Sequence, residues 1–306
     1  MDWRAEIEAA AGRIAPHVRR TPVIATQLPG LDRAVEFKLE QLQHTGSFKA
    51  RGAFNTLLSG PVPAAGVVAA SGGNHGAAVA HAARALGHPA RIFVPELAGP
   101  SKIALIRRTG ADLTVVPGTY AEALAAARAH EAETGATQIH AYDAPPTVAG
   151  QGTLMREWED QGLTADTVLI AVGGGGLIAG ALAWLGGRRK VVAVEPELCP
   201  TLHRALAEGP ETEVEVSGIA ANALGARRIG AICHGLARAQ GVAPVLVTDA
   251  AIAEAQALLW REMRQLVEPA GATALAALLS GAYSPEPGER LAVLVCGANP
   301  APDPFP

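Results

Sequence analysis

Lysine, aromatic residues and cysteine are scarce in this sequence, and it has no excess of positive charge. Aromatic residues are 4% of the chain, and only four of its 25 basic residues are lysines, at Lys38, Lys49, Lys102 and Lys190. The formal net charge is −4 and there is no basic tail, which excludes nucleic acid or an anionic membrane as the main partner. The three cysteines are far apart and form no CxxC pair, which excludes a disulfide framework or a thiolate metal site and favours the cytoplasm. We therefore expect a small metabolite as the partner.

The stretch Val168 to Leu185 has no charged residue and is about as long as a membrane-spanning helix, but it contains five glycines. We interpret it as a buried strand, a turn and a buried helix. With 306 residues, 49% of them hydrophobic, and a mean hydropathy of +0.20, the chain is long enough for two lobes with well-buried cores.

Short runs of β-branched residues alternate with longer runs rich in alanine and leucine, which is typical of a parallel α/β sheet. The first series predicts strands at 66–70, 91–94 and 113–116 and helices at 74–86, 101–109 and 120–133. The second series predicts strands at 167–172, 191–194, 245–247 and 291–295 and helices at 146–161, 177–185, 227–240 and 250–265. Two series predict an α/β protein with two lobes, each an open, mainly parallel twisted sheet flanked by helices.

Four consecutive glycines, Gly173 to Gly176, join a predicted strand to a predicted helix. Consecutive glycines leave backbone N–H groups free to converge, and the positive N-terminal end of the helix adds to them, so this turn suits a phosphate. One interpretation is a dinucleotide site, because Gly174, Gly176 and Ala179 match G-x-G-x-x-G/A and Glu195 ends the next strand, where an acid would bind a ribose hydroxyl. On that alternative the protein is an NAD-dependent oxidoreductase.

Lys49 stands where a turn enters a helical stretch that runs to Leu58, and Ser47 is placed to cap its first turn. The positive end of the helix dipole and Arg51 both disfavour a protonated amine there, which should lower the pKa of Lys49 and favour its nucleophilic form. A second strand, glycine turn and helix occurs at 71–76, where free N–H groups suit a carboxylate. The other three lysines lie beside strands or open a helix, and we expect arginine to serve in their place.

Four segments together resemble fold-type II pyridoxal-phosphate enzymes, most closely the serine/threonine dehydratase (threonine ammonia-lyase) and serine racemase branch. They are Ser-Phe-Lys-Ala-Arg-Gly-Ala at 47–53, Ser-Gly-Gly-Asn-His-Gly at 71–76, the four glycines at 173–176 and Cys-Gly-Ala-Asn at 296–299. The resemblance covers nearly the whole chain and implies a fold like that of the tryptophan synthase β-subunit. It also implies a large cofactor-binding domain at 1–65 and 141–306 and a small domain at 66–140.

By this resemblance, Lys49 is the catalytic residue and forms the Schiff base with pyridoxal 5'-phosphate. The residues that the resemblance places around the cofactor are Phe48, Lys49, Asn74, Gly173, Gly174, Gly175, Gly176 and Cys296. Those that it places at the substrate are Ser71, Gly72, Asn74, His75 and Gln151. The freed lysine would take the Cα proton, and loss of the β-hydroxyl would lead to a 2-oxo acid and ammonia. A thiol at Cys296 is a weak hydrogen-bonding partner for the ring nitrogen, which favours elimination over transamination.

The resemblance implies a homodimeric dehydratase for a β-hydroxy amino acid, with L-threonine and L-serine as first choices. A 3-hydroxyaspartate dehydratase, a serine racemase, a β-replacing enzyme related to cysteine synthase and a catalytically silent binding protein stay open. Racemases of this branch have a serine at the position of Gly72; a glycine cannot move a proton, so we expect little or no racemisation. Their divalent-cation site needs an acid where this chain has Thr201, six positions after Glu195, so we expect no metal. Glu268 resembles a residue near the ring but could equally begin a helix, and we interpret His140 as an ordinary histidine.

Overall fold

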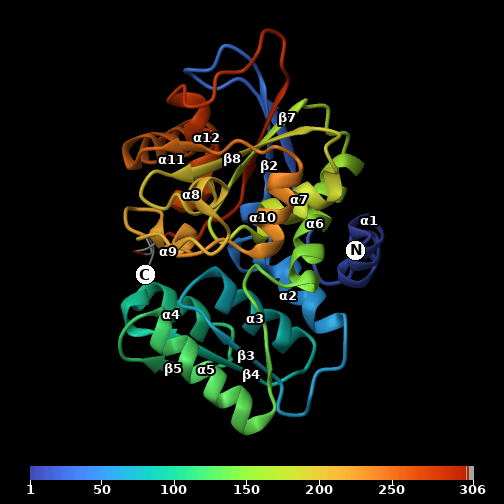
Figure 1. Cartoon of the computed structure of the whole chain (residues 1–306), viewed down its shortest axis with the longest axis vertical. Coiled ribbons are helices and arrows are strands. Elements are labelled where there is room, and N and C mark those ends of the chain that lie inside the picture. The colour runs from blue at the N-terminus through green and yellow to red at the C-terminus, as the bar shows by residue number, and fades with distance from the viewer. Residues whose placement is uncertain (301, 303–306) are drawn as a thin grey trace.

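The computed structural model describes residues 1–300 and 302, which form two α/β lobes (Figure 1). The large lobe contains a six-stranded sheet in the order β1-β2-β10-β7-β8-β9. Its strands are β1 (Val23–Thr26), β2 (Val35–Leu39), β10 (Leu291–Val295), β7 (Thr167–Ala171), β8 (Lys190–Pro196) and β9 (Val245–Val247). β1 runs antiparallel to β2, and the other neighbouring strands are parallel. Every residue of β7 and β10 is buried, as expected for central parallel strands covered on both faces.

The small lobe, at the bottom of Figure 1, contains a four-stranded parallel sheet in the order β5-β4-β3-β6. Its strands are β5 (Asp112–Val116), β4 (Ala90–Pro95), β3 (Val67–Ala70) and β6 (Thr137–Gln138). Alternate residues of β3 enter different cores, because successive side chains of a strand point to opposite faces. Val67 and Ala69 pack with helix α3, and Val68 and Ala70 with helix α5. Two open, mainly parallel sheets flanked by helices confirm the predicted fold class.

The helices connect these strands and cover the sheets. They are α1 (Trp3–Ile14), α2 (Lys49–Leu58), α3 (Asn74–Ala85), α4 (Pro100–Arg107), α5 (Tyr120–Thr134), α6 (Pro145–Asp160), α7 (Gly176–Leu185), α8 (Thr201–Glu208), α9 (Ala221–Leu224), α10 (Ala231–Ala239), α11 (Asp249–Met263) and α12 (Pro269–Leu279). Three short 3-10 helices are η1 (Glu40–Leu42), η2 (His44–Gly46) and η3 (Glu96–Ala98). The predicted strands and helices match the observed bounds to within two residues, except for the start of α10.

Helix α10 begins at Ala231, four residues later than the predicted start at 227. Gly230 precedes it with an extended backbone, and the carboxylate of Asp143 accepts hydrogen bonds from the N–H groups of Ala231 and Ile232, both at 3.0 Å. The residue that satisfies the first turn of α10 therefore lies 88 positions earlier in the chain, where local sequence could not indicate it.

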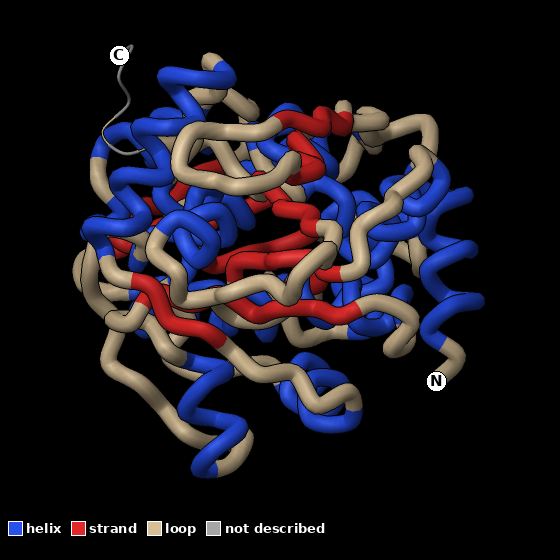
Figure 2. Tube along the Cα trace, turned by 90° about the horizontal axis from the view of Figure 1, so that it is seen from above, coloured by secondary structure: helices blue, strands red, loops and turns tan. Residues whose placement is uncertain are grey.

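The fold brings the predicted motifs to the strand ends that face the other lobe. The 173–176 turn follows β7, and Cys296 follows the paired parallel strand β10, so both lie at the same edge of the large sheet. Helices α2 and α6 pack against each other between the two sheets (Figure 1). Seen from above in Figure 2, the strands run through the interior with helices around them. The uncharged stretch 168–185 forms β7 and α7, and no helix in the described residues is both long and apolar enough to cross a membrane.

Candidate active site

Lys49 is the first residue of α2, and its side chain crosses to the segment that follows β6. Its Nζ donates a hydrogen bond to Ala141 O at 2.8 Å and lies 5.0 Å from the centre of the Phe48 ring. Desolvation lowers the pKa of Lys49 to about 8, although coupling to the ionisable groups of Cys296 and Glu268 acts in the opposite direction. At pH 7 about one such amine in ten is neutral, against roughly one in several thousand for an exposed lysine.

Arg51 does not cause this lowered pKa, contrary to our prediction. Arg51 is 1% exposed and forms ion pairs with Glu40 (Nε to Oε1, 2.6 Å) and with Glu157 (Nη2 to Oε2, 2.9 Å). The other oxygen of Glu157 binds Lys38 Nζ at 2.6 Å. Two cations and two carboxylates thus form a buried group with no net formal charge. Its field at Lys49 is small, and burial alone makes the ammonium of that lysine unfavourable.

Lys38 is completely buried, which contradicts the expectation that arginine would serve in its place. Its Nζ donates to Thr21 O at 2.9 Å and to Gln161 Oε1 at 2.7 Å in addition to Glu157. These three acceptors surround a compact ammonium, whereas a guanidinium is planar and larger. A compact ammonium therefore suits this position better than a guanidinium.

We predicted that the side chain of Ser47 caps the start of α2. The structure shows instead that backbone contacts with the end of β10 hold this start. The residue before the helix is Phe48, and the hydroxyl of Ser47 is buried with no partner in the described residues. Instead, Ser47 forms a β-bridge with Gly297, and Phe48 N donates to Cys296 O at 3.2 Å. Cys296 is 2% exposed, its Sγ donates to Ala270 O at 3.4 Å, and burial raises the pKa of its thiol. A neutral thiol therefore lies close to Lys49.

The 173–176 turn has backbone donors that are available to a ligand. Within the described residues, the backbone N–H groups of its four glycines have no hydrogen-bond partner, although three of these glycines are buried. Gly175 has φ +92°, and α7 begins at Gly176. A Cβ at Gly176 would lie 2.8 Å from Tyr142 Cα, and a Cβ at Gly174 would overlap the Tyr142 ring. Unpartnered N–H groups at a helix N-terminus, in a space that side chains would fill, fit a phosphate group.

The 71–76 turn has the same character at the start of α3. Gly73 N donates to Ser71 Oγ at 3.2 Å, and the other N–H groups from Gly72 to Gly76 have no partner in the described residues. The ring of His75 is buried, with Nε2 2.9 Å from Ile139 O. Desolvation and the nearby Lys49 charge lower the pKa of His75 to about 3, so the ring is neutral and Nε2 donates to the carbonyl. Four free N–H groups beside a neutral ring suit a carboxylate.

Asn74 joins the two lobes through its side chain. Its Nδ2 donates to Glu268 Oε1 at 2.5 Å, and its Oδ1 accepts from Asn299 Nδ2 at 2.8 Å. Glu268 is 2% exposed, and desolvation raises its pKa to about 7 despite the opposing charge of Lys102. Glu268 directly precedes α12, as one of its two interpretations predicted, and it also contacts Asn74, which we predicted to bind the cofactor.

Gln151 and Glu195 lie deeper than the turns. Gln151 is 1% exposed on α6, where a Cβ at Gly52 would overlap its Nε2, and its Oε1 has no partner in the described residues. Glu195 is 0% exposed, and its two oxygens accept from the N–H groups of Leu202 (2.7 Å) and His203 (2.8 Å) in α8. Both oxygens thus serve the first turn of α8, which differs from the ribose-binding role of the dinucleotide alternative.

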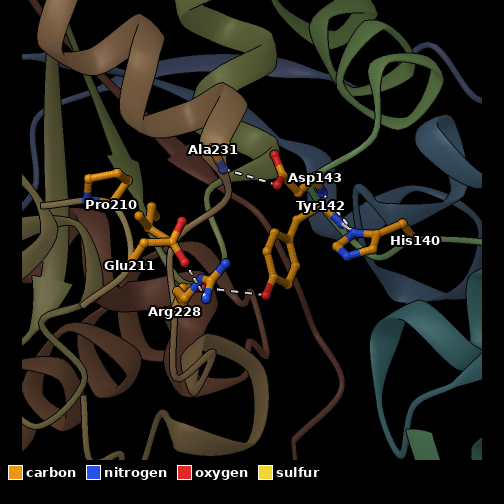
Figure 3. Close-up of a pocket in the computed structure, with 8 residues that line it drawn as sticks. His140, Tyr142, Asp143, Pro210, Glu211, Arg228 and Ala231 are labelled. Carbon is orange, nitrogen blue, oxygen red and sulfur yellow. Dashed lines mark hydrogen bonds and ion pairs between the residues drawn. The ribbon is translucent and has the colours of Figure 1, made fainter. Parts of the chain in front are cut away.

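A pocket of about 140 Å³ opens beside the segment that carries Ala141 (Figure 3). The polar residues that line it are His140, Tyr142, Asp143, Glu211 and Arg228. His140 Nδ1 accepts from the N–H groups of Tyr142 (3.3 Å) and Asp143 (2.9 Å). His140 therefore orders the segment whose Ala141 carbonyl binds Lys49, a role that its isolated position in the sequence did not indicate.

Comparison with known proteins identifies the family. A family model for pyridoxal-phosphate dependent enzymes matches residues 14–297. The chain belongs to this family. It is 37% identical to a phenylserine dehydratase of Ralstonia pickettii, over 96% of this chain and 93% of that protein. It is 36% identical to an L-threonine ammonia-lyase of Geobacter sulfurreducens, over 95% of this chain and 74% of that protein.

Solved structures agree with this assignment. Maize serine racemase matches with a TM-score of 0.90 and 31% identity, covering 97% of this chain and 93% of that one. A threonine deaminase from T.th. matches with a TM-score of 0.90 and 36% identity, covering 98% of this chain and 99% of that one. The predicted cofactor and fold type are thereby confirmed, and this pyridoxal-phosphate enzyme is a lyase of the β-hydroxy amino acid dehydratase type. The nicotinamide alternative is set aside.

Proposed function

We propose that this enzyme converts L-threonine or L-serine into a 2-oxo acid and ammonia. The observation that carries the proposal is Lys49, a lysine with a pKa lowered to about 8, together with two glycine turns whose N–H groups, among the described residues, are left without partners and available to an anion. One turn suits the cofactor phosphate and the other a substrate carboxylate. Relatives named L-threonine ammonia-lyase in Geobacter sulfurreducens and Thermotoga maritima, 36% and 35% identical, support this choice of substrate.

Bound pyridoxal phosphate supplies an electron sink for the negative charge that forms when the substrate Cα loses a proton. We propose that the 173–176 turn holds its phosphate, with Phe48, Asn74 and Cys296 around the ring. The amine of Lys49 takes the Cα proton, and the substrate loses its β-hydroxyl as water. One water molecule is taken up again when ammonia is released, so the net products are a 2-oxo acid and ammonia. The 71–76 turn, with His75, and Gln151 are proposed to bind the substrate.

Two further β-hydroxy amino acids should be compared with threonine and serine as substrates. The relative from Ralstonia pickettii is named for phenylserine, and a relative from Paracoccus denitrificans, 33% identical over 95% of this chain, is named beta-hydroxyaspartate dehydratase. Formation of 2-oxo acid should be measured with L-threonine, L-serine, 3-phenylserine and 3-hydroxyaspartate. Higher kcat/KM for either of the last two than for threonine and serine would replace the proposed substrate but keep the reaction.

Racemisation is expected to be weak or absent. Gly72 has no side chain that moves a proton, and a Cβ at this position would overlap the Cβ of Ala98 in the neighbouring turn. Ala98 therefore occupies the space that a serine at position 72 would need. Chiral analysis of serine during turnover tests this expectation, and equal rates of racemisation and deamination would contradict it.

The cofactor assignment has its own test. The purified protein should be yellow, and its visible band should disappear on borohydride reduction and in Lys49→Ala. Lys49→Arg should be inactive, because a guanidinium stays charged and does not form an imine. A colourless protein that binds NAD, or Lys49→Arg with full turnover, would contradict the proposal.

We also propose that residues 66–140 are the small domain, that 1–65 with 141–306 are the large cofactor-binding domain, and that the enzyme is a cytoplasmic homodimer. The strands of the four-stranded sheet all lie between Val67 and Gln138, which supports the domain division. The free cysteines Cys199, Cys233 and Cys296 are compatible with a reducing compartment. Light scattering of the purified protein tests the dimer, which a monomeric mass would exclude.

A further inference from the structure

Lys102 is a buried cation at the junction of the two lobes. It is the third residue of α4 in the small lobe and is 4% exposed. Its Nζ donates to Asn222 O in the large lobe at 3.0 Å. A small cavity of about 20 Å³ adjoins it, lined also by Glu268 and Asn299. The sequence predicted that Lys102 opens a helix, which the structure confirms, but it did not indicate that this side chain is buried between the lobes.

No carboxylate in the described residues forms an ion pair with Lys102. Glu268 shares the cavity and interacts with Lys102 through its charge, but its Oε1 accepts from Asn74. In the described residues the hydrogen-bond partner of the Lys102 ammonium is a neutral carbonyl, and Glu268 acts on it without forming an ion pair, so its lost hydration is compensated only in part. The site is therefore favourable for an anion supplied from outside the chain.

The 71–76 turn places the other half of an anion site beside this cation. Lys102 Nζ lies 3.4 Å from the position that a Cβ would take at Gly73. The N–H groups of Gly72, Asn74, His75 and Gly76 have no partner in the described residues. They belong to the N-terminus of a 12-residue helix, which adds its own positive end. Free N–H groups and a buried ammonium that forms no ion pair in the described residues together suit a carboxylate, which takes up hydrogen bonds on both oxygens.

We propose that the Lys102 ammonium forms an ion pair with the α-carboxylate of the substrate amino acid. This inference rests on the proposed function only in taking the ligand to be an amino acid. Lys102 thereby becomes a substrate-binding residue from the small lobe that also holds Asn222 of the large lobe. Binding of a carboxylate at this point satisfies the buried charge and the free N–H groups of the 71–76 turn together.

The test compares two ligands that differ only in the carboxylate. Glycine and glycinamide both carry the amine but lack a β-hydroxyl, so neither undergoes elimination. Their Kd values are measured on the holoenzyme from the change in visible absorbance of the bound cofactor. In Lys102→Met the Kd for glycine should rise about 10- to 100-fold, as expected for loss of a charge-assisted hydrogen bond, while the Kd for glycinamide changes less than about threefold.

Three further variants make the result decisive. Lys102→Gln keeps a donor for Asn222 O without the charge and should show the same selective loss if Lys102→Met does not fold. Lys102→Arg keeps the charge and should retain most of the preference for glycine. Lys190→Met, at a side chain that is 57% exposed and pairs with Glu289, should leave both Kd values unchanged.

An equal rise in both Kd values in Lys102→Met would show that Lys102 only joins the lobes. An unchanged Kd for glycine would show that the carboxylate binds elsewhere. Either result overturns the inference. Neither measurement needs turnover. If no β-hydroxy amino acid is converted but the glycine preference still depends on Lys102, the proposed function fails and this inference stands.

Discussion

Gly176→Ala should release the cofactor although it introduces a better helix-forming residue. Gly176 is the first residue of α7, and a Cβ there would lie 2.8 Å from Tyr142 Cα and 2.9 Å from Tyr142 Cβ. Non-bonded carbons approach to about 3.5–4.0 Å, so the turn and the Tyr142 backbone must separate by roughly 1 Å. Two effects of opposite sign then compete. The gain in helix propensity is at most about 1 kcal/mol, whereas overpacking against backbone atoms costs about 1–3 kcal/mol.

The loss of cofactor binding should exceed the loss of stability. A shift of the turn by roughly 1 Å would lengthen the hydrogen bonds that we propose between its N–H groups and the cofactor phosphate. Loss of one such charge-assisted bond costs about 1.5–3 kcal/mol, which is roughly 10- to 150-fold in Kd. Equilibrium dialysis of apoprotein with pyridoxal phosphate measures the Kd, and thermal unfolding of the apoprotein measures the stability.

Gly235→Ala is the matched control. Gly235 lies within α10, and a Cβ there would meet nothing within 4 Å. Only the propensity effect remains, so this variant should keep the wild-type Kd and gain up to about 1 kcal/mol of stability. A Gly176→Ala protein with wild-type Kd and unfolding temperature would refute the reasoning, because it would show that the Tyr142 segment yields without cost.

Three more outcomes follow from the same geometry. Gly72→Ala should lower kcat/KM for 2-oxo acid formation about 100-fold, because its Cβ displaces the 71–76 turn, which we propose to bind the substrate carboxylate. Adding Ala98→Gly should restore most of kcat/KM, and a double variant no better than the single variant would contradict the steric explanation. Arg51→Met should lower the free energy of unfolding by about 3–5 kcal/mol, because it leaves a buried carboxylate unpaired, and adding Glu40→Gln should recover part of the loss in urea titrations. The rate at which apoprotein takes up the cofactor should rise about tenfold per pH unit up to about pH 8 and then level off. The reason is that we expect the neutral amine of Lys49 to react, and its pKa is lowered to about 8. A rate that still rises above pH 9 would mean that Lys49 has the pKa of an exposed lysine.

Local sequence was sufficient for the alternation of strands and helices and for the two glycine turns. The strands 245–247 and 291–295 have the predicted bounds, because a run of β-branched residues between turns contains its own signal. The positions of the 173–176 and 71–76 turns, each between a strand and a helix, were also predictable. Free N–H groups after a strand and before a helix follow from consecutive residues alone. The chemical suitability of Lys49 for an imine likewise depends only on its being a primary amine.

The surroundings of these residues were decided by the tertiary structure. Arg51 lies two positions from Lys49, yet it is neutralised by Glu40 and Glu157, and the latter is 106 positions away. Asp143 sets the start of α10 from 88 positions away, and Lys102 reaches Asn222 O across 120 positions. A pKa and a substrate contact depend on burial and on which charges lie within a few ångströms. The periodicity of the sequence carries no information about burial or about contacts between distant segments. The glycine turns could therefore be predicted from the sequence, whereas the charged groups that lie around them could not.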